Sequence, residues 1–169
     1  MDKDKPGEQK IGHQYWNVDK KYEKNMLADN ELMRGNFVMF FDRHKIGHKA
    51  IVDQVLRHSC LLMYTTEDAG EYGQEVIVNY EDIHGIPITA DILEKNGLPK
   101  RDCPVLPDLL AYGFGIYEIE QYPNNREKGE WEISITIEYE GTDLRTVKYV
   151  HELQQFMKVN ETGYKITTV

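Results

Sequence analysis

One segment of the chain has the pattern of a β-strand at every position. Across residues 131–140, apolar side chains alternate with polar ones without a break. A period of two places the apolar side chains on one face of a strand and the polar ones on the other. Such a strand belongs in an antiparallel sheet that has one face against a core and the other in water. The apolar positions are Trp131, Ile133, Ile135, Ile137 and Tyr139.

Short apolar runs predict further strands in the N-terminal half. They are rich in Val, Ile, Phe, Leu and Tyr, and Gly, Asp, Asn or His bounds each of them. The runs are residues 36–41, 50–56, 60–65 and 75–80. Their close spacing predicts an SH3-like small β-barrel or curled sheet, with residues 66–74 as a hairpin loop. Because Pro87 has no N–H to donate, we expect residues 83–88 to leave this sheet.

The second half of the chain predicts both helices and strands. Thr89 is a good N-cap, and Gly97 is a good terminating residue, for a helix over residues 90–96. Apolar residues at helical spacing predict a second helix over residues 148–158. Strands are expected at residues 115–122, 144–147 and 164–169, and loops or turns at residues 98–111, 123–129 and 141–143.

These elements together predict an α+β fold. An N-terminal SH3-like barrel or curled sheet would be followed by antiparallel strands with two short helices. Residues 1–28 have few aliphatic side chains and predict a flexible or irregular arm, whose Tyr15, Trp16 and Tyr22 would anchor it to its own domain or to a partner. Residues 29–169 would form a single α+β domain, with a β-rich half at 29–88 and an α+β half at 89–169.

Charge and composition exclude several kinds of partner. The chain has 20 Lys and Arg against 29 Asp and Glu, a formal charge of -9, which repels the backbone of duplex nucleic acid. No apolar stretch approaches the roughly 20 residues that a membrane-spanning helix needs. Cys60 and Cys103 stand in unlike contexts without a pairing pattern, which favours a reduced, cytosolic protein. No motif predicts a cofactor.

The segment YVHELQQF at residues 149–156 is one residue short of the H-E-x-x-H zinc signature, because Gln155 replaces the second histidine. A glutamine amide is a poor zinc ligand, so we interpret the segment as a helix with a packing role. His151 and Glu152 could still form an acid–base pair, although adjacent helical residues point about 100° apart.

Other histidines give weaker indications of chemistry. His44 and His48 have metal-like spacing only if their turn is helical, which Gly47 disfavours. His58, Ser59 and Cys60 are consecutive, and consecutive strand residues point to opposite faces and do not converge. We therefore predict no metal site and no catalytic residue. The phosphate-binding glycine motifs and the nucleophile elbow are also absent from the sequence.

Three segments resemble a known group of proteins. They are ELMRGNFV at residues 31–38, IPITADILEKNG at residues 86–97 and KYVHELQ at residues 148–154. Together they resemble a family of small uncharacterised proteins carried by bacteriophages and mobile elements of gut bacteria, with L-R-x-G-N-x-V, P-[IL]-T-x-x-x-L-x-x-x-G-F and Y-V-H-x-L-Q segments. Leu98 departs from the usual Phe of the second motif. The resemblance covers about residues 31–157. It implies an accessory protein in a bacterial host cytoplasm, or a virion component, and no activity.

We expect a non-enzymatic binding protein with a protein partner, because catalytic signatures are absent, the chain is acidic and its strands are rich in tyrosine. A small-molecule ligand and a homo-oligomer remain open. One alternative is a phage counter-defence protein that captures a nucleotide signal through Lys100 and other cations, or inhibits a defence enzyme. Another is a metal-dependent hydrolase that uses the His151-Glu152 helix. The candidate binding residues are Trp16, Arg57, Arg101, Lys148, Tyr149, His151 and Glu152.

Overall fold

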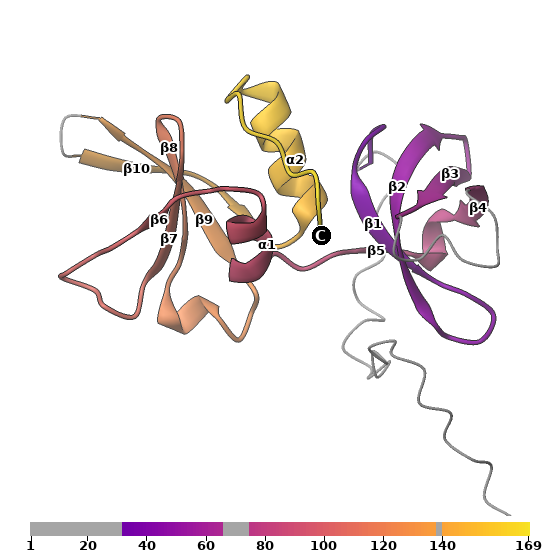
Figure 1. The fold of residues 1–169 in the computed structure, drawn as a ribbon, viewed down its shortest axis with the longest axis horizontal. Coiled ribbons are helices and arrows are strands. Elements are labelled where there is room, and N and C mark those ends of the chain that lie inside the picture. Colours follow the sequence, from indigo (N-terminus) through magenta and orange to yellow (C-terminus); the bar gives the residue numbers. More distant parts are fainter. Residues whose placement is uncertain (1–31, 66–74, 138–139) are drawn as a thin grey trace, which may run out of the picture.

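The fold consists of two five-stranded antiparallel sheets and two short α-helices. The computed structural model describes residues 32–65, 75–137 and 140–169. Figure 1 shows the two sheets standing apart, with both helices between them. The α+β class predicted from the sequence is therefore confirmed.

The first sheet is a curled meander with the strand order β4-β3-β2-β1-β5. Its edge strands β4 and β5 do not pair with each other, so the described strands form an open curled sheet and not a closed barrel. A single turn of 3-10 helix, Tyr80–Asp82, joins β4 to β5. The strands are β1 Phe37–Phe41, β2 Gly47–Val55, β3 Ser59–Tyr64, β4 Glu75–Asn79 and β5 Ile83–Gly85.

The concave face of this sheet encloses a cluster that we call the inner core. It is contributed by strands that are neighbours in the sequence, together with Leu32 and Tyr80. The alternation of side chains along a strand explains which residues enter this core. In β2, every second residue from His48 to Val52 is buried. The strand members of the inner core are Val38, Phe40, Ala50, Val52, Cys60, Leu62, Val78 and Ile83.

The second sheet has the strand order β10-β9-β8-β7-β6. Helix α1, Ala90–Lys95, precedes this sheet, and helix α2, Val150–Val159, follows it. The Thr89 hydroxyl caps α1 by accepting from the Ile92 N–H at 3.3 Å, as predicted. The strands are β6 Lys100–Arg101, β7 Leu110–Phe114, β8 Tyr117–Gln121, β9 Trp131–Ile137 and β10 Glu140–Val147.

A larger cluster, which we call the shared core, fills the space between the two sheets. The helices and the second sheet supply most of it, and β1 supplies Phe37 and Met39. Strand β1 is thus buried on both faces, because Val38 and Phe40 point into the inner core. The remaining members are Ile86, Ile88, Ile92, Leu93, Leu98, Tyr112, Phe114, Ile119, Trp131, Ile133, Val147, Val150, Leu153, Phe156, Met157 and Ile166.

The connection from β5 to α1 runs beside the connection from β10 to α2, and we call this region of contact the joint. Pro87 forms an isolated antiparallel bridge with Tyr149. On either side of it, the Ile88 N–H donates to the Lys148 carbonyl and the Val150 N–H to the Ile86 carbonyl, both at 2.9 Å. These backbone hydrogen bonds fix the start of α2 against the segment that leads into α1.

Several elements differ from the sequence-based prediction. Residues 83–85 remain in the first sheet as β5, because Pro87 lies two residues beyond the pairing with β1. The predicted loop at 98–111 contains β6 and the start of β7, and residues 141–143 lie within β10 instead of a turn. Residues 164–169, predicted as a strand, have no strand pairing. The expected arm at 1–28 and the expected hairpin loop at 66–74 lie outside the described residues.

Candidate functional site

The C-terminal tail, residues 160–169, returns from the end of α2 toward α1 and the first sheet. Asn96 holds it: its side-chain amide donates to the Thr168 carbonyl at 2.8 Å, and its side-chain oxygen accepts from the Thr168 N–H at 3.1 Å. This side chain pairs with the tail as a neighbouring strand would. Lys49 of β2 donates to the backbone oxygen of Val169 at 2.9 Å. The tail is therefore attached to both halves of the molecule.

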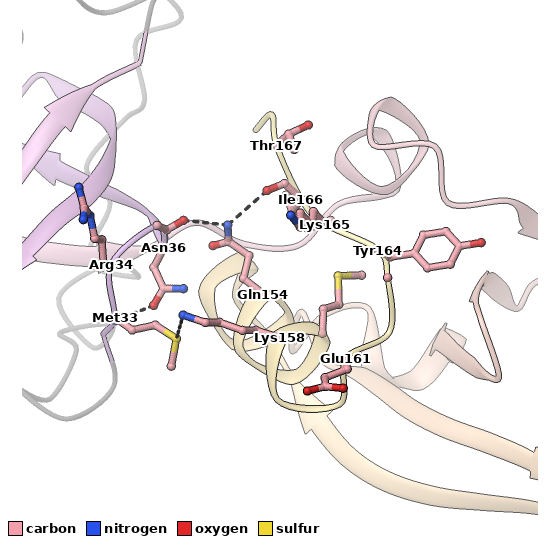
Figure 2. Close-up of a pocket in the computed structure, with 13 residues that line it drawn as sticks. Met33, Arg34, Asn36, Gln154, Lys158, Glu161, Tyr164, Lys165, Ile166 and Thr167 are labelled. Atoms are coloured by element: carbon pink, nitrogen blue, oxygen red, sulfur yellow. Dashed lines mark hydrogen bonds between the residues drawn. The ribbon is translucent and has the colours of Figure 1, made fainter.

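A cleft of about 670 Å³ lies between the start of the first sheet, α2 and this tail. Figure 2 shows its two sides facing each other across α2. Exposed polar side chains line its mouth, whereas Met157 and Ile166 in its walls are buried. The lining residues are 33–36 on one side, Gln154, Met157 and Lys158 on α2, and residues 161 and 163–167 on the other side.

Gln154 ties the three walls of the cleft together. Its side-chain oxygen accepts from the Phe37 N–H at 2.8 Å. Its amide nitrogen donates to the Gly35 carbonyl at 3.1 Å and to the Ile166 carbonyl at 3.4 Å, as the dashed lines in Figure 2 show. Because Gln154 belongs to α2, its side chain links this helix to the start of the first sheet and to the tail. This arrangement requires an amide, because the group must both accept and donate.

The cleft carries more positive than negative charge, although the whole chain is acidic. Arg34, Lys158 and Lys165 line it, against the single carboxylate of Glu161. Arg34 is paired with Asp53 at 2.9 Å. Within the described part of the chain, neither lysine lies within ion-pair distance of a carboxylate. Lys158 reaches across the mouth toward Met33, with 3.9 Å between its ammonium nitrogen and the sulfur (Figure 2).

Glu161 has an unusual backbone conformation. Its φ of 48° lies in the left-handed region, where residues other than glycine are uncommon. It follows Asn160, the C-cap of α2, and the hydrogen bonds there are those of a Schellman motif. Glycine is the common residue directly after a helix C-cap, so an acidic residue at position 161 is a local feature of the sequence. Glu161 was nevertheless not among the residues predicted for the site.

Tyr149, His151 and Glu152 belong to the joint and do not line the cleft. Glu152 accepts from the backbone N–H groups of Lys148 at 2.6 Å and Tyr149 at 2.9 Å, so its carboxylate caps the start of α2. His151 is 2% exposed, and its ring stacks on that of Tyr149 with centroids 5.8 Å apart. These contacts give all three side chains a packing or capping role.

The predicted cationic residues lie in separate parts of the molecule. Arg57 is exposed in the turn between β2 and β3 of the first sheet. Arg101 belongs to β6 of the second sheet, where its guanidinium lies 3.9 Å from Glu118. Lys148 pairs with Glu130 at 3.0 Å. Trp16 lies outside the described residues. The structure does not bring these cations together in the cleft.

His44 and His48 are not on a common helical turn. His48 is a buried residue of β2, next to the rings of Phe40 and Tyr64. Burial alone would raise the pKa of Asp42, but the N–H groups of Ile46 and His44 and the ring of His48 outweigh it, so this pKa is lowered. Asp42 therefore organises the turn that carries His44 and leads into β2, where His48 lies.

The outer face of the second sheet carries carboxylates from neighbouring strands. Glu120 of β8 lies directly opposite Glu132 of β9. Burial raises the pKa of Glu120, and the nearby charge of Glu118 raises it further. The Tyr122 hydroxyl donates to Glu120 at 3.3 Å, which opposes this shift. Like charges opposite each other on strands are destabilising, so this face is electrostatically costly to the fold.

The described residues show neither a metal-binding cluster nor a membrane-spanning helix. Within the three described ranges, no group of three or more His, Cys, Asp or Glu side chains is arranged to hold a metal ion. None of the helices in these ranges is long and apolar enough to cross a membrane. Comparisons with protein-family models, with curated protein sequences and with solved structures also found no match.

Proposed function

We propose that the protein is a non-enzymatic binding protein and that the cleft beside α2 holds a segment of a protein partner. The observation that supports this most directly is the charge of the cleft. Although the chain has a net charge of -9, Lys158 and Lys165 both line this cleft, and neither pairs with a carboxylate in the described ranges. Unpaired cations around buried apolar side chains suit a partner that offers both apolar and charged groups.

The dimensions of the cleft also support a partner segment. Its volume of about 670 Å³ lies within the ordinary range for ligand sites, which is roughly 300–1,000 Å³. In the tail that forms one wall, the backbone groups of Lys165 have no hydrogen-bond partner within the described ranges. An extended peptide would find unpaired backbone donors and acceptors there, as in recognition by strand addition.

The resemblance of residues 31–38, 86–97 and 148–154 to phage and mobile-element proteins adds a biological setting to this proposal. In that setting the partner would be a bacterial or phage protein in the host cytoplasm. A nucleotide signal is the second candidate, favoured by Lys158 and Lys165 of the cleft, which could contact phosphate groups. Of the cations first assigned to nucleotide binding, Arg57, Lys100, Arg101 and Lys148 all lie outside the cleft.

Site-specific photocrosslinking tests the proposal. Arg34, whose side chain is 81% exposed at the mouth of the cleft, is replaced by p-benzoylphenylalanine. Val105, which is 86% exposed and outside the cleft, is replaced in a control protein. We expect a discrete crosslinked protein from bacterial lysate at position 34 only, and we expect the second substitution Lys158→Glu to abolish it.

Lys95→Glu is the matched control, because Lys95 is the basic residue in the last turn of α1 as Lys158 is in α2. It should leave the crosslink intact. Equal crosslinking from positions 34 and 105, or a crosslink that survives Lys158→Glu, would contradict the proposal. Competition by added ATP would support the nucleotide candidate instead.

A further inference from the structure

The two helices of this protein end in the same way but with different residues. After α1, the Gly97 N–H donates to the Glu94 carbonyl at 2.9 Å and the Leu98 N–H to the Leu93 carbonyl at 3.1 Å. After α2, the corresponding bonds run from Glu161 to Lys158 at 3.3 Å and from Thr162 to Met157 at 3.2 Å. Both ends are Schellman motifs, which need a left-handed residue at this position.

Glycine adopts the left-handed conformation without the steric penalty that a Cβ brings. Gly97 does so with a φ of 74°, whereas Glu161 does so with a φ of 48° despite its side chain. Glycine at position 161 would therefore allow α2 to end in the same way without this steric penalty. Strain of this kind is concentrated at functional sites, where the side chain is needed for something other than folding.

The side chain of Glu161 lies in the cleft, which is where such a use is expected. Lys158 stands one helical turn earlier, but it points across the mouth toward Met33, away from Glu161 (Figure 2). The two side chains do not form an ion pair with each other, although their spacing along the helix would allow one. Both charges therefore remain available to a bound molecule.

We infer that Glu161 is a specificity-determining residue of the cleft, and that the bound protein segment carries a cationic group that contacts Glu161 beside an anionic group that contacts Lys158. This inference rests on the proposed function. It favours a polypeptide over a nucleotide, because a nucleotide has no cationic group at neutral pH to pair with the Glu161 carboxylate, which would repel its phosphates. A peptide with an acidic side chain, apolar residues and a basic side chain matches both charges and the apolar walls.

The first test separates the backbone role of Glu161 from its role in the cleft. Lys45 is the matched control, since it is the other non-glycine residue with a positive φ in the described ranges and lies in the turn between β1 and β2. Glu161→Gly and Lys45→Gly should each raise the midpoint of thermal unfolding by about 2–4 °C. Only Glu161→Gly should weaken capture of the crosslinked partner.

The second test measures the charge pattern of the ligand. Short synthetic peptides, with Asp-Leu-Ser-Leu-Lys as the dipolar probe and versions lacking either charge, are titrated into the full chain by fluorescence polarisation. The dipolar peptide should bind about fivefold more tightly than either single-charge version. Glu161→Gln should remove the advantage conferred by the basic residue, and Lys158→Gln the advantage conferred by the acidic residue.

The outcomes distinguish this inference from the proposed function. Loss of the crosslink in Lys158→Glu but not in Glu161→Gly or Glu161→Gln would overturn the inference and leave the proposed function standing. Equal binding of all peptides, no binding of any peptide, or tighter binding of ATP would likewise overturn it. The absence of a cleft-specific crosslink in the chain that carries p-benzoylphenylalanine at position 34 and no further substitution would instead remove the proposed function itself.

Discussion

The inner core and the shared core are both well buried, but they are assembled from the sequence in different ways. The inner core draws on residues between Leu32 and Ile83, through strands that follow one another along the chain. The shared core draws on residues from Phe37 to Ile166 and combines β1, both helices, the second sheet and the tail. The first is built by local pairing and the second by long-range contact.

This difference explains where the cleft lies. The inner core is enclosed by one continuous curled sheet, whereas the shared core is bounded by separate elements that meet at their edges. The start of β1, the end of α2 and the tail meet at one such edge, and their side chains leave a cleft there. Binding sites are common where separate elements or domains meet. Strand β1 makes the two cores dependent on each other, because it is buried in both.

The largest losses of stability are expected when a buried side chain of either core is shortened to alanine. Leu62→Ala in the inner core and Leu153→Ala in the shared core each remove a side chain that is at most 1% exposed. Each should lower the free energy of unfolding by roughly 2–5 kcal/mol. Because β1 belongs to both cores, both variants should still unfold in one transition, measured by urea titration with circular dichroism.

Hydrogen exchange tests whether the two cores unfold as independent units. If Leu62→Ala weakened the protection of β3 amides but left β7 amides unchanged, the cores would be independent units. We expect protection to fall in both strands.

The joint should be the next most sensitive region. Gly85 of β5 packs directly under Tyr149, and a Cβ at position 85 would lie 2.6 Å from the Cδ1 atom of that ring. Gly85→Ala should therefore cost roughly 1–3 kcal/mol of stability through overpacking. In a Tyr149→Ala background the same substitution should cost much less, because the ring is gone. A double-mutant cycle in urea measures this coupling, and additive effects would show that the contact is unimportant.

The walls of the cleft depend on the amide of Gln154. Gln154→Glu keeps an acceptor for the Phe37 N–H but removes the donor to the Gly35 and Ile166 carbonyls. We expect a loss of about 1–3 kcal/mol, because two carbonyl groups then face a carboxylate. Gln155→Glu is the control, since Gln155 donates to Asn36 at 3.2 Å but does not line the cleft. Equal losses of unfolding free energy in the two variants would contradict this bridging role.

The smallest effect is expected at Tyr112, in the part of the shared core that joins α1 to β7. Burial raises the pKa of Tyr112 to about 12, and its hydrogen bond to Glu94 at 2.8 Å adds to the shift. The folded state therefore holds this proton more tightly than the unfolded state does. Its contribution to stability is complete below pH 10 and is lost as the pH rises toward 12.

Tyr112→Phe should cost about 1 kcal/mol at neutral pH and should flatten the loss of stability between pH 10 and pH 12. Thermal unfolding of both proteins across this range measures the difference. An unchanged pH dependence in the variant would show that another group is responsible.

The parts of the fold that the sequence predicted correctly depend on local pattern. Alternation marked β9, short apolar runs marked most of the first sheet, and the capping residues Thr89 and Gly97 marked α1. Strand β7 was missed, because its sequence LAYGF has little alternation and follows a loop rich in proline. It is a strand because its neighbours pair with it on both sides. Local propensity yields to such tertiary pairing.

The candidate site was less predictable than the fold. The YVHELQQF segment attracted attention for His151 and Glu152, yet Gln154 of the same segment lines the cleft. Lys158 and Lys165 have no motif that marks them, since they come together only when the tail returns beside α2. Among these residues, only Glu161 has a local feature that sequence analysis could have used. It is an acidic residue directly after the C-cap Asn160, where glycine is common.

The sequence by itself determined the two helices, where they stop, and those strands that have a clear apolar pattern, among them β9 and most of the first sheet. These properties depend on periods of two and 3.6 residues and on capping chemistry within a few residues of each helix end. Only the tertiary structure decided that β1 is shared by two cores, that the tail lies against Asn96 and Gln154, and that a cleft opens between them. The physical reason is that these contacts join residues more than ten positions apart, and up to 119, whose pairing no local pattern encodes.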